Sequence, residues 1–164
     1  NRDGMIFNEI GLRPCFTVLA LKYLIGVAGR LFGSDEVRAE RLGEVPLGTE
    51  NWGGETLADH HTFLVRYTPD TDRSLAMHID ECDITFNIGL SSSEDFKGAN
   101  LVFCGNYGDP AYRRHLHTYQ PELGRCVVHA GKRRHGVVDV EAGERAALII
   151  WTSSLLFRGT EEYK

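Results

Sequence analysis

Short apolar runs, separated by glycine, proline, asparagine or acidic residues, dominate the chain after residue 60. Within each run the residues are mainly β-branched or aromatic, which predicts β-strands. The predicted strands are residues 62–68, 83–91, 100–105, 124–130, 136–140 and 145–153. Several short strands at close spacing are typical of a sandwich or barrel and not of a βαβ fold. The sequence therefore predicts a mainly β domain.

A different period precedes the strands. Apolar residues recur every three to four positions between residues 16 and 31, which predicts a helix packed by one face. The face consists of Phe16, Leu19, Ala20, Tyr23, Val27 and Leu31. Pro14 suits the start of this helix and Gly33 its end. Residues 34–43 predict a second short helix capped by Ser34, residues 44–56 a loop, and residues 105–124 a long connection.

The two faces of the predicted strands differ in polarity. In residues 83–91, Thr85, Asn87 and Gly89 share one face, opposite four aliphatic or aromatic residues. That polar face either meets water or lines a pocket. In residues 145–153, Arg145 lies on the same face as Ile149 and Trp151. A cation among apolar neighbours is costly unless an anion pairs with it.

Composition limits the alternatives. The chain has 164 residues, 42% of them hydrophobic, and a formal net charge of −5. We expect one folded domain over residues 1–164 and no general affinity for nucleic acid. The basic run at residues 131–136 is most simply a solvated loop. The longest apolar run, residues 16–29, is interrupted by Lys22 and Tyr23 and is expected to be too short for a membrane span.

The four cysteines are scattered without a CxxC pair and are interpreted as free thiols: Cys15, Cys82, Cys104 and Cys126. No secretory signal is recognisable, and the chain does not begin with methionine, so it is expected to be a fragment. The sequence does not indicate a compartment or an oligomeric state.

Two good metal ligands, His78 and Asp80, stand two residues apart on a predicted extended segment. Their side chains project to the same side and can reach one ion. A third ligand must come from elsewhere, and the candidates are His129 and His135. Two imidazoles and a carboxylate leave other coordination positions open, which suits non-haem Fe(II) oxygen chemistry, whereas structural zinc would use four closed ligands.

Arg145 strengthens this interpretation. It follows His135 by ten residues on the adjoining predicted strand, and an arginine fork binds a carboxylate through two hydrogen bonds. The spacing favours His135 as the ligand and leaves His129 as a core histidine or a neighbour of the ligands. The simpler alternative is a surface ion pair for Arg145 and a loop position for His135. The remaining histidines, at positions 60, 61, 115 and 117, are expected on the surface or in loops, and Trp52 and Trp151 in the core.

The order HxD, distant His, then Arg ten residues later resembles the 2-oxoglutarate and Fe(II)-dependent dioxygenases. Residues 65–103 are similar to the catalytic domain of the procollagen-lysine hydroxylases. The segments "MIFNEIGL" and "HAGKRRHGVVDVEAGER" are closer still to the 2-oxoglutarate and iron-dependent oxygenase domain-containing proteins. The resemblance extends from Met5 to about Trp151. Two departures are Ala99, where the family has a second glycine, and Asp139, where many relatives have proline.

The resemblance implies a double-stranded β-helix (jelly-roll) with flanking helices. It implies that His78, Asp80 and His135 hold Fe(II) and that Arg145 binds the distal carboxylate of 2-oxoglutarate. Three further residues, Tyr67, Thr85 and Asn87, would border that co-substrate.

The implied reaction is hydroxylation of a C–H bond by molecular oxygen, with release of succinate and carbon dioxide and with ascorbate as the reductant. The implied substrate is a protein side chain, although the pocket residues do not separate a peptide from a small molecule.

Two other functions are compatible with the residues. A cupin-like jelly-roll could bind a metal without turnover, but such a module has no need of Arg145. Nucleic-acid demethylation through the basic run is disfavoured by the negative net charge. Residues 105–124, with Arg113 and Arg114, are the expected substrate rim.

Overall fold

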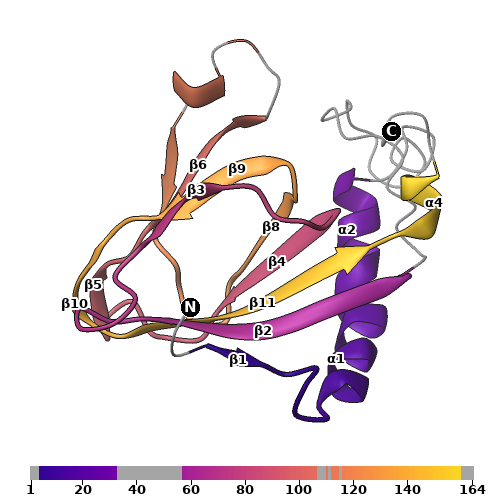
Figure 1. Ribbon diagram of the computed structural model, residues 1–164, viewed down its shortest axis with the longest axis horizontal. Helices are drawn as coiled ribbons and strands as arrows, with labels where there is room; N and C mark the ends of the chain where they lie inside the picture. Colours follow the sequence, from indigo (N-terminus) through magenta and orange to yellow (C-terminus); the bar gives the residue numbers. More distant parts are fainter. Residues whose placement is uncertain (1–3, 33–56, 107–109, 111, 115, 160–164) are drawn as a thin grey trace.

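Two antiparallel sheets face each other in the computed structural model, which describes residues 4–32, 57–106, 110, 112–114 and 116–159 (Figure 1). The larger sheet has the order β1 (Met5–Ile6), β2 (Asp59–Tyr67), β11 (Arg145–Ser153), β4 (Ile84–Gly89) and β8 (Cys126–Ala130). The smaller has the order β3 (Leu75–His78), β9 (Arg133–Val137), β6 (Leu101–Asn106) and β7 (His117–Tyr119). The mainly β prediction is confirmed.

A two-stranded sheet of β5 (Phe96–Gly98) and β10 (Val140–Gly143) closes one end of the sandwich (Figure 1). A short 3₁₀-helix, η2 (Tyr112–Arg114), lies in the β6–β7 connection, and α4 (Leu155–Arg158) follows β11. Gly98 and Ala99 both have positive φ, 75° and 50°. The turn after β5 thus keeps a left-handed backbone although Ala99 replaces the family's second glycine.

Strand register places the inward side chains in rows. In the larger sheet one row across β2, β11, β4 and β8 is His61, Trp151, Thr85 and His129. Three rows further along, Tyr67 of β2 is opposite Arg145 of β11. In the smaller sheet, His78 of β3 is opposite His135 of β9. The metal-ligand candidates and Arg145 therefore lie at different levels of the same sandwich.

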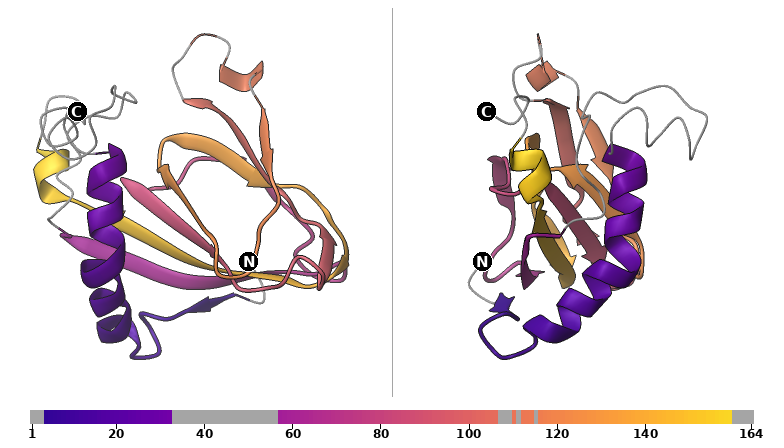
Figure 2. Two further views of the ribbon diagram at one scale, coloured as in Figure 1. Left: turned by 180° about the vertical axis from the view of Figure 1, so that it is seen from behind. Right: turned by 90° about the vertical axis from the view of Figure 1, so that its right-hand side faces the viewer.

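One helix covers the outer face of the larger sheet (Figure 2). It runs as α1 (Arg13–Leu19), a π-helical turn η1 (Ala20–Leu24) and α2 (Ile25–Phe32). Its buried residues Ile25 and Ala28 pack with outward side chains of the sheet, among them Phe86 and Ile150. The predicted polarity of β4 is confirmed, because Ile84, Phe86 and Ile88 belong to this outer core.

The predicted packing face of the helix is partly wrong. Tyr23, Val27 and Leu31 are exposed, while Ile25 and Ala28 are buried. The π-helical turn is wider than an α-helical turn and shifts the register of the residues that follow it, so the contact face moves. A uniform 3.6-residue period could not predict that shift.

Residues Arg13–Phe32 form a helix long and apolar enough to cross a membrane by length and composition, with a mean hydropathy of 1.6. This differs from the expectation that the apolar run is too short. A single helix of this kind is weak evidence for a span, and here its buried residues pack on the sheet.

Other predictions need correction. The basic run at residues 131–136 is not a loop throughout, because β9 begins at Arg133. Residues 136–140 divide between β9 and β10, and the long connection contains β7.

The four cysteines are free, as expected. The predicted second helix, the loop at 44–56, Trp52 and His115 lie outside the described residues.

Candidate active site

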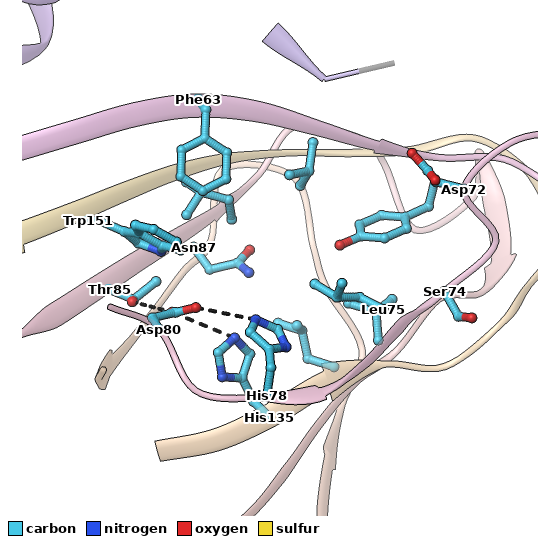
Figure 3. Close-up of a pocket in the computed structure, with 15 residues that line it drawn as sticks. Phe63, Asp72, Ser74, Leu75, His78, Asp80, Thr85, Asn87, His135 and Trp151 are labelled. Atoms are coloured by element: carbon cyan, nitrogen blue, oxygen red, sulfur yellow. Dashed lines mark hydrogen bonds and ion pairs between the residues drawn. The ribbon is translucent and has the colours of Figure 1, made fainter. Parts of the chain in front are cut away.

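Three potential ligands lie close together in one pocket (Figure 3). One donor atom each from His78, Asp80 and His135 lies within 4.8 Å of the others. Nε2 of His78 is 3.3 Å from Oδ1 of Asp80, and Nε2 of His135 is 3.7 Å from Oδ2. The imidazoles come from paired strands, β3 and β9, whereas the carboxylate comes from the loop after β3.

The Asp80 carboxylate is fixed from two directions. The Thr85 hydroxyl of β4 donates a hydrogen bond of 2.5 Å to Oδ2. The backbone N–H of Asp80 donates to the carbonyl of Gly131 at 3.0 Å, and the Gly131 N–H donates to the carbonyl of Asp83 at 2.8 Å. The loop that carries Asp80 is thus attached to the β8–β9 turn, which places a carboxylate from one loop beside ligands from two strands.

The histidine tautomers suit a cation. Nδ1 of His78 lies 2.8 Å from the carbonyl of Ala76, and Nδ1 of His135 lies 2.9 Å from the carbonyl of Arg133. A carbonyl can only accept, so each Nδ1 carries the hydrogen and each Nε2 presents a lone pair toward Asp80. Fixing the ligand tautomer through the distal ring nitrogen is typical of metal-bound histidine. The donor set fits a divalent ion with open positions.

The electrostatics of the three groups are coupled. When Nε2 of His78 is protonated, it donates a hydrogen bond to Asp80, and this bond raises the pKa of His78. Burial alone would raise the pKa of Asp80, but hydrogen bonding to His78 and the proximity of His135 outweigh it and lower that pKa. Burial lowers the pKa of His135. The carboxylate therefore stays ionised and attracts positive charge, which a proton on His78 or a metal ion can supply.

A cavity of about 250 Å³ extends from these ligands between the sheets. Thr85 and Asn87 line it together with Tyr67 and Trp151, so the polar face of β4 lines a pocket, which was one of its two predicted alternatives. Six apolar residues also line it, of which the sequence had marked only Ile149, as a neighbour of Arg145: Phe63, Val65, Leu75, Leu101, Val137 and Ile149. Asp72 and Ser74 also line it, from the β2–β3 connection. Apart from Ile149 and Leu75, the apolar lining residues were marked in the sequence only by their place in predicted strands, which many core residues share. Leu75, Asp72 and Ser74 lie outside the predicted strands and had no such signal.

Arg145 lies behind Tyr67. The guanidinium carbon is 5.3 Å from the centroid of the Tyr67 ring, and the side chain is 1% exposed. None of its three nitrogens has a hydrogen-bond partner among the described residues. Burial lowers the pKa of Arg145 and raises that of Tyr67 to about 12, against the opposing effect of Arg145 on Tyr67. The structure thus holds a buried cation, as predicted, and leaves its donors available to an anion.

Two histidines differ from their predicted surface positions. His60 of β2 is buried and bonds through Nε2 to Thr17 Oγ1 at 2.7 Å and through Nδ1 to Thr62 Oγ1 at 3.0 Å. His61 is half-buried against Phe63 and Trp151. His117, in β7, is exposed as expected. Both corrected residues lie in β2, whose predicted start at residue 62 was too late.

Comparison with known proteins identifies relatives of the whole domain. No protein-family model matches the chain. The chain is 34% identical to 2-oxoglutarate and iron-dependent oxygenase domain-containing protein CP2 of Arabidopsis thaliana, over 96% of this chain and 36% of the relative. It is 28% identical to 2-oxoglutarate and iron-dependent oxygenase domain-containing protein 2 of Xenopus tropicalis, over 92% of this chain and 38% of the relative. The chain therefore spans less than half the length of the curated relatives it matches.

One further relative and one solved structure are also similar to the chain. A PKHD-type hydroxylase of Shewanella baltica is 28% identical over 68% of this chain and 43% of its own length. A solved prolyl 4-hydroxylase from Phytophthora capsici superposes with a TM-score of 0.52 and 17% identity, over 93% of this chain and 48% of that chain. The second similarity concerns the fold and confirms the predicted jelly-roll. The chain is a homologue of the 2-oxoglutarate and iron-dependent oxygenase domain-containing proteins and has the double-stranded β-helix fold.

Proposed function

We propose that the domain is a 2-oxoglutarate-dependent oxygenase that hydroxylates a C–H bond and releases succinate and carbon dioxide. Two features of the same domain support this most directly. One is the group of three potential metal ligands, and the other is a buried guanidinium without a hydrogen-bond partner among the described residues. The three ligands and Tyr67 line one cavity, and Arg145, which does not itself line it, stacks on the Tyr67 ring. A module that only binds metal gains nothing from the desolvated cation.

His78, Asp80 and His135 would hold Fe(II), which supplies the activation of oxygen when it is bound. The Arg145 guanidinium would pair with the distal carboxylate of 2-oxoglutarate, with Tyr67 stacked beside it. Thr85 holds Asp80 in place through its hydroxyl, and Asn87 presents an amide to the cavity. The apolar walls would exclude water from the reacting groups.

The substrate proposed is a peptide or protein side chain. Two of the proteins compared above bear the names PKHD-type hydroxylase and prolyl 4-hydroxylase, and neither name fixes the residue that this chain would modify. Ascorbate is proposed as the reductant that keeps the iron ferrous.

A thermal-shift titration tests the binding half of this proposal. Mn(II) alone should raise the Tm, 2-oxoglutarate alone should not, and both together should raise it further. Ligand that binds only the native state stabilises by RT ln(1 + [L]/Kd), so a second shift requires a second binding event. A shift with metal and none with the keto acid would instead indicate a metal-binding module.

Succinate release tests turnover. Fe(II), 2-oxoglutarate and ascorbate are supplied in air with candidate peptides, and succinate is measured for the native protein and for His78→Ala. Release by the native protein that is lost in the variant supports the proposal. Equal release by both would place the chemistry elsewhere and refute the assignment of this site.

A further inference from the structure

A third imidazole faces the proposed metal site without belonging to the ligand group. His129 lies in β8, directly opposite Thr85 of β4. Its ring centroid is 4.4 Å from that of His135, and its Nε2 is 3.9 Å from Oδ2 of Asp80. The ring of Phe103 packs edge-on against His129, with the two centroids 5.3 Å apart. The side chain is thus held in one orientation, toward the carboxylate.

The tautomer of His129 is the same as that of the two ligand candidates. Its Nδ1 lies 2.9 Å from the carbonyl of Ala130, so Nδ1 carries the hydrogen and Nε2 has a free lone pair. The residue is 6% exposed, and Nε2 has no hydrogen-bond partner among the residues that the structure describes. A buried acceptor therefore faces a carboxylate oxygen, which is also an acceptor.

Two acceptors do not stabilise each other. An unsatisfied buried polar atom is unfavourable, and native proteins rarely keep one without a ligand, ion or water to bind it. If position 129 had only a packing role, an apolar side chain would be more stable there than a histidine with an unsatisfied nitrogen. The missing group must carry a positive charge or a donor hydrogen.

We propose that His129 is a positioning residue of the metal site, whose Nε2 accepts a hydrogen bond from a water molecule on the bound metal. This inference rests on the proposed function, because it requires metal at His78, Asp80 and His135. Direct ligation by His129 fits less well. His129 lies outside the group whose donors are all within 4.8 Å, and four protein ligands would leave only two of six positions for a chelating keto acid and oxygen.

The test uses Mn(II) with His129→Leu, which removes the acceptor at similar volume, and His129→Gln, which restores one. Calorimetry measures the Mn(II) affinity, and water-proton relaxation of the Mn(II) complex measures the residence time of its bound water. For His129→Leu we expect about a tenfold loss of affinity and a shortened residence time, since one hydrogen bond is lost. His129→Gln should recover much of both. His129→Met replaces the leucine variant if that variant does not fold.

A purely structural role of His129 predicts different results in these measurements. Removing a purely structural histidine should lower the Tm of the metal-free protein and leave the Mn(II) affinity of the folded protein unchanged, and that result would overturn the inference. A changed intensity of the Co(II) absorption bands in His129→Leu would indicate direct ligation and overturn it as well. His78→Ala serves as the control for the site itself: if it still binds Mn(II) as tightly as the native protein, the proposed function fails and not merely the role of His129.

Discussion

Among single residues, Arg145 carries a buried charge that we expect to lower the stability of the ligand-free protein. Its guanidinium is desolvated and has no hydrogen-bond partner among the described residues. Replacing such a group by an apolar side chain of similar length is often neutral or stabilising, although it abolishes what the charge was placed to bind. An apolar substitution of Arg145 should therefore keep or raise the stability of the ligand-free protein while it weakens the binding of an anion.

We predict that Arg145→Met keeps or raises the Tm of the ligand-free protein and removes the additional shift that 2-oxoglutarate gives with Mn(II). Arg145→Lys is the matched control, since it retains the charge but not the planar fork, and it should bind the keto acid at least about tenfold more weakly than arginine. An unchanged 2-oxoglutarate shift in Arg145→Met would refute the assignment of this residue.

A second prediction concerns the hydroxyl that holds Asp80. Thr85→Val keeps the shape of the side chain and removes the 2.5 Å hydrogen bond to Oδ2. Loss of a partner that orients a metal ligand typically weakens metal affinity by about 10- to 100-fold. Calorimetric titration with Mn(II) measures the change, and Thr85→Ser should stay close to the native affinity. Equal affinities of the valine and serine variants would contradict the orienting role.

Between elements, the contact of Gly131 in the β8–β9 turn with the loop after β3 fixes the geometry of the site. A Cβ at Gly131 would lie 1.9 Å from the carbonyl oxygen of Cys82 and 3.1 Å from that of Asp80. Backbone cannot move aside as a side chain can, so the turn and the loop must separate. Gly131→Ala should lower the free energy of unfolding by about 2 kcal/mol and weaken Mn(II) binding.

Gly26 provides the control for that substitution. It lies in α2, with no atom within 4 Å of the added Cβ. Alanine forms helix better than glycine, so Gly26→Ala should raise the free energy of unfolding by up to about 1 kcal/mol without affecting Mn(II). Urea unfolding and calorimetry measure both variants. If Gly131→Ala binds Mn(II) as the native protein does, the turn does not position Asp80.

The junction between α1 and β2 should be sensitive to pH. Burial lowers the pKa of His60, and the neighbouring Arg13 adds to the effect. The unfolded chain then binds the proton more readily than the native state between the unfolded value of about 6.5 and the lower native pKa. The stability that neutral His60 provides is complete above pH 6.5 and is lost as the pH falls below it.

Urea unfolding of native protein and His60→Gln between pH 7.5 and 5 measures this. The native protein should lose more stability over that range than the variant. The dependence that remains in the variant is the sum of two opposing contributions: the lowered pKa values of His129 and His135 reduce stability as the pH falls, and the raised pKa of His78 increases it. Parallel pH profiles of the two proteins would show that His60 does not contribute.

Local pattern predicted the longer strands but not the short ones. Runs of β-branched and aromatic residues identified β2, β4, β6, β8 and β11, because each of these strands is long enough to contain such a run. Strands such as β5 and β7 have three residues each, which is too short for a run to be recognised. The face of the helix was misplaced because a π-helical turn changes the register, which depends on tertiary packing and not on the apolar spacing.

In the whole molecule, the candidate site depends on closure of one sheet over the other. The sequence alone indicated His78 and Asp80 as a pair and left His129 and His135 as alternatives for the third ligand. Both imidazoles reach Asp80, at 3.9 Å and 3.7 Å, because β8 and β9 belong to opposite sheets that meet at their connecting turn. These distances depend on how the sheets pack and cannot be read from a local sequence pattern. In the sequence, the ten-residue spacing to Arg145 favoured His135 over His129, and the resemblance to a known family gave the reason why that spacing matters.

The two faces of the larger sheet have different roles: the outer face packs against the helix, and the inner face lines the cavity. Ile150 points outward and is fully buried under the helix, whereas its neighbour Ile149 points inward and lines the cavity. Deleting buried methyl groups lowers stability by the lost transfer free energy plus the cost of the remaining void. The outward residue should therefore affect folding alone, and the inward one should affect binding as well.

We predict that Ile150→Ala lowers the free energy of unfolding by about 2–5 kcal/mol and leaves the affinities for Mn(II) and 2-oxoglutarate unchanged at a temperature where the variant is folded. Ile149→Ala should cost less stability, because its side chain already borders a cavity, and it should weaken 2-oxoglutarate binding. Urea unfolding and calorimetric titration distinguish the two variants. Weakened 2-oxoglutarate binding in Ile150→Ala at full folding would mean that the outer layer shapes the cavity through the sheet, and the two faces would then not be independent.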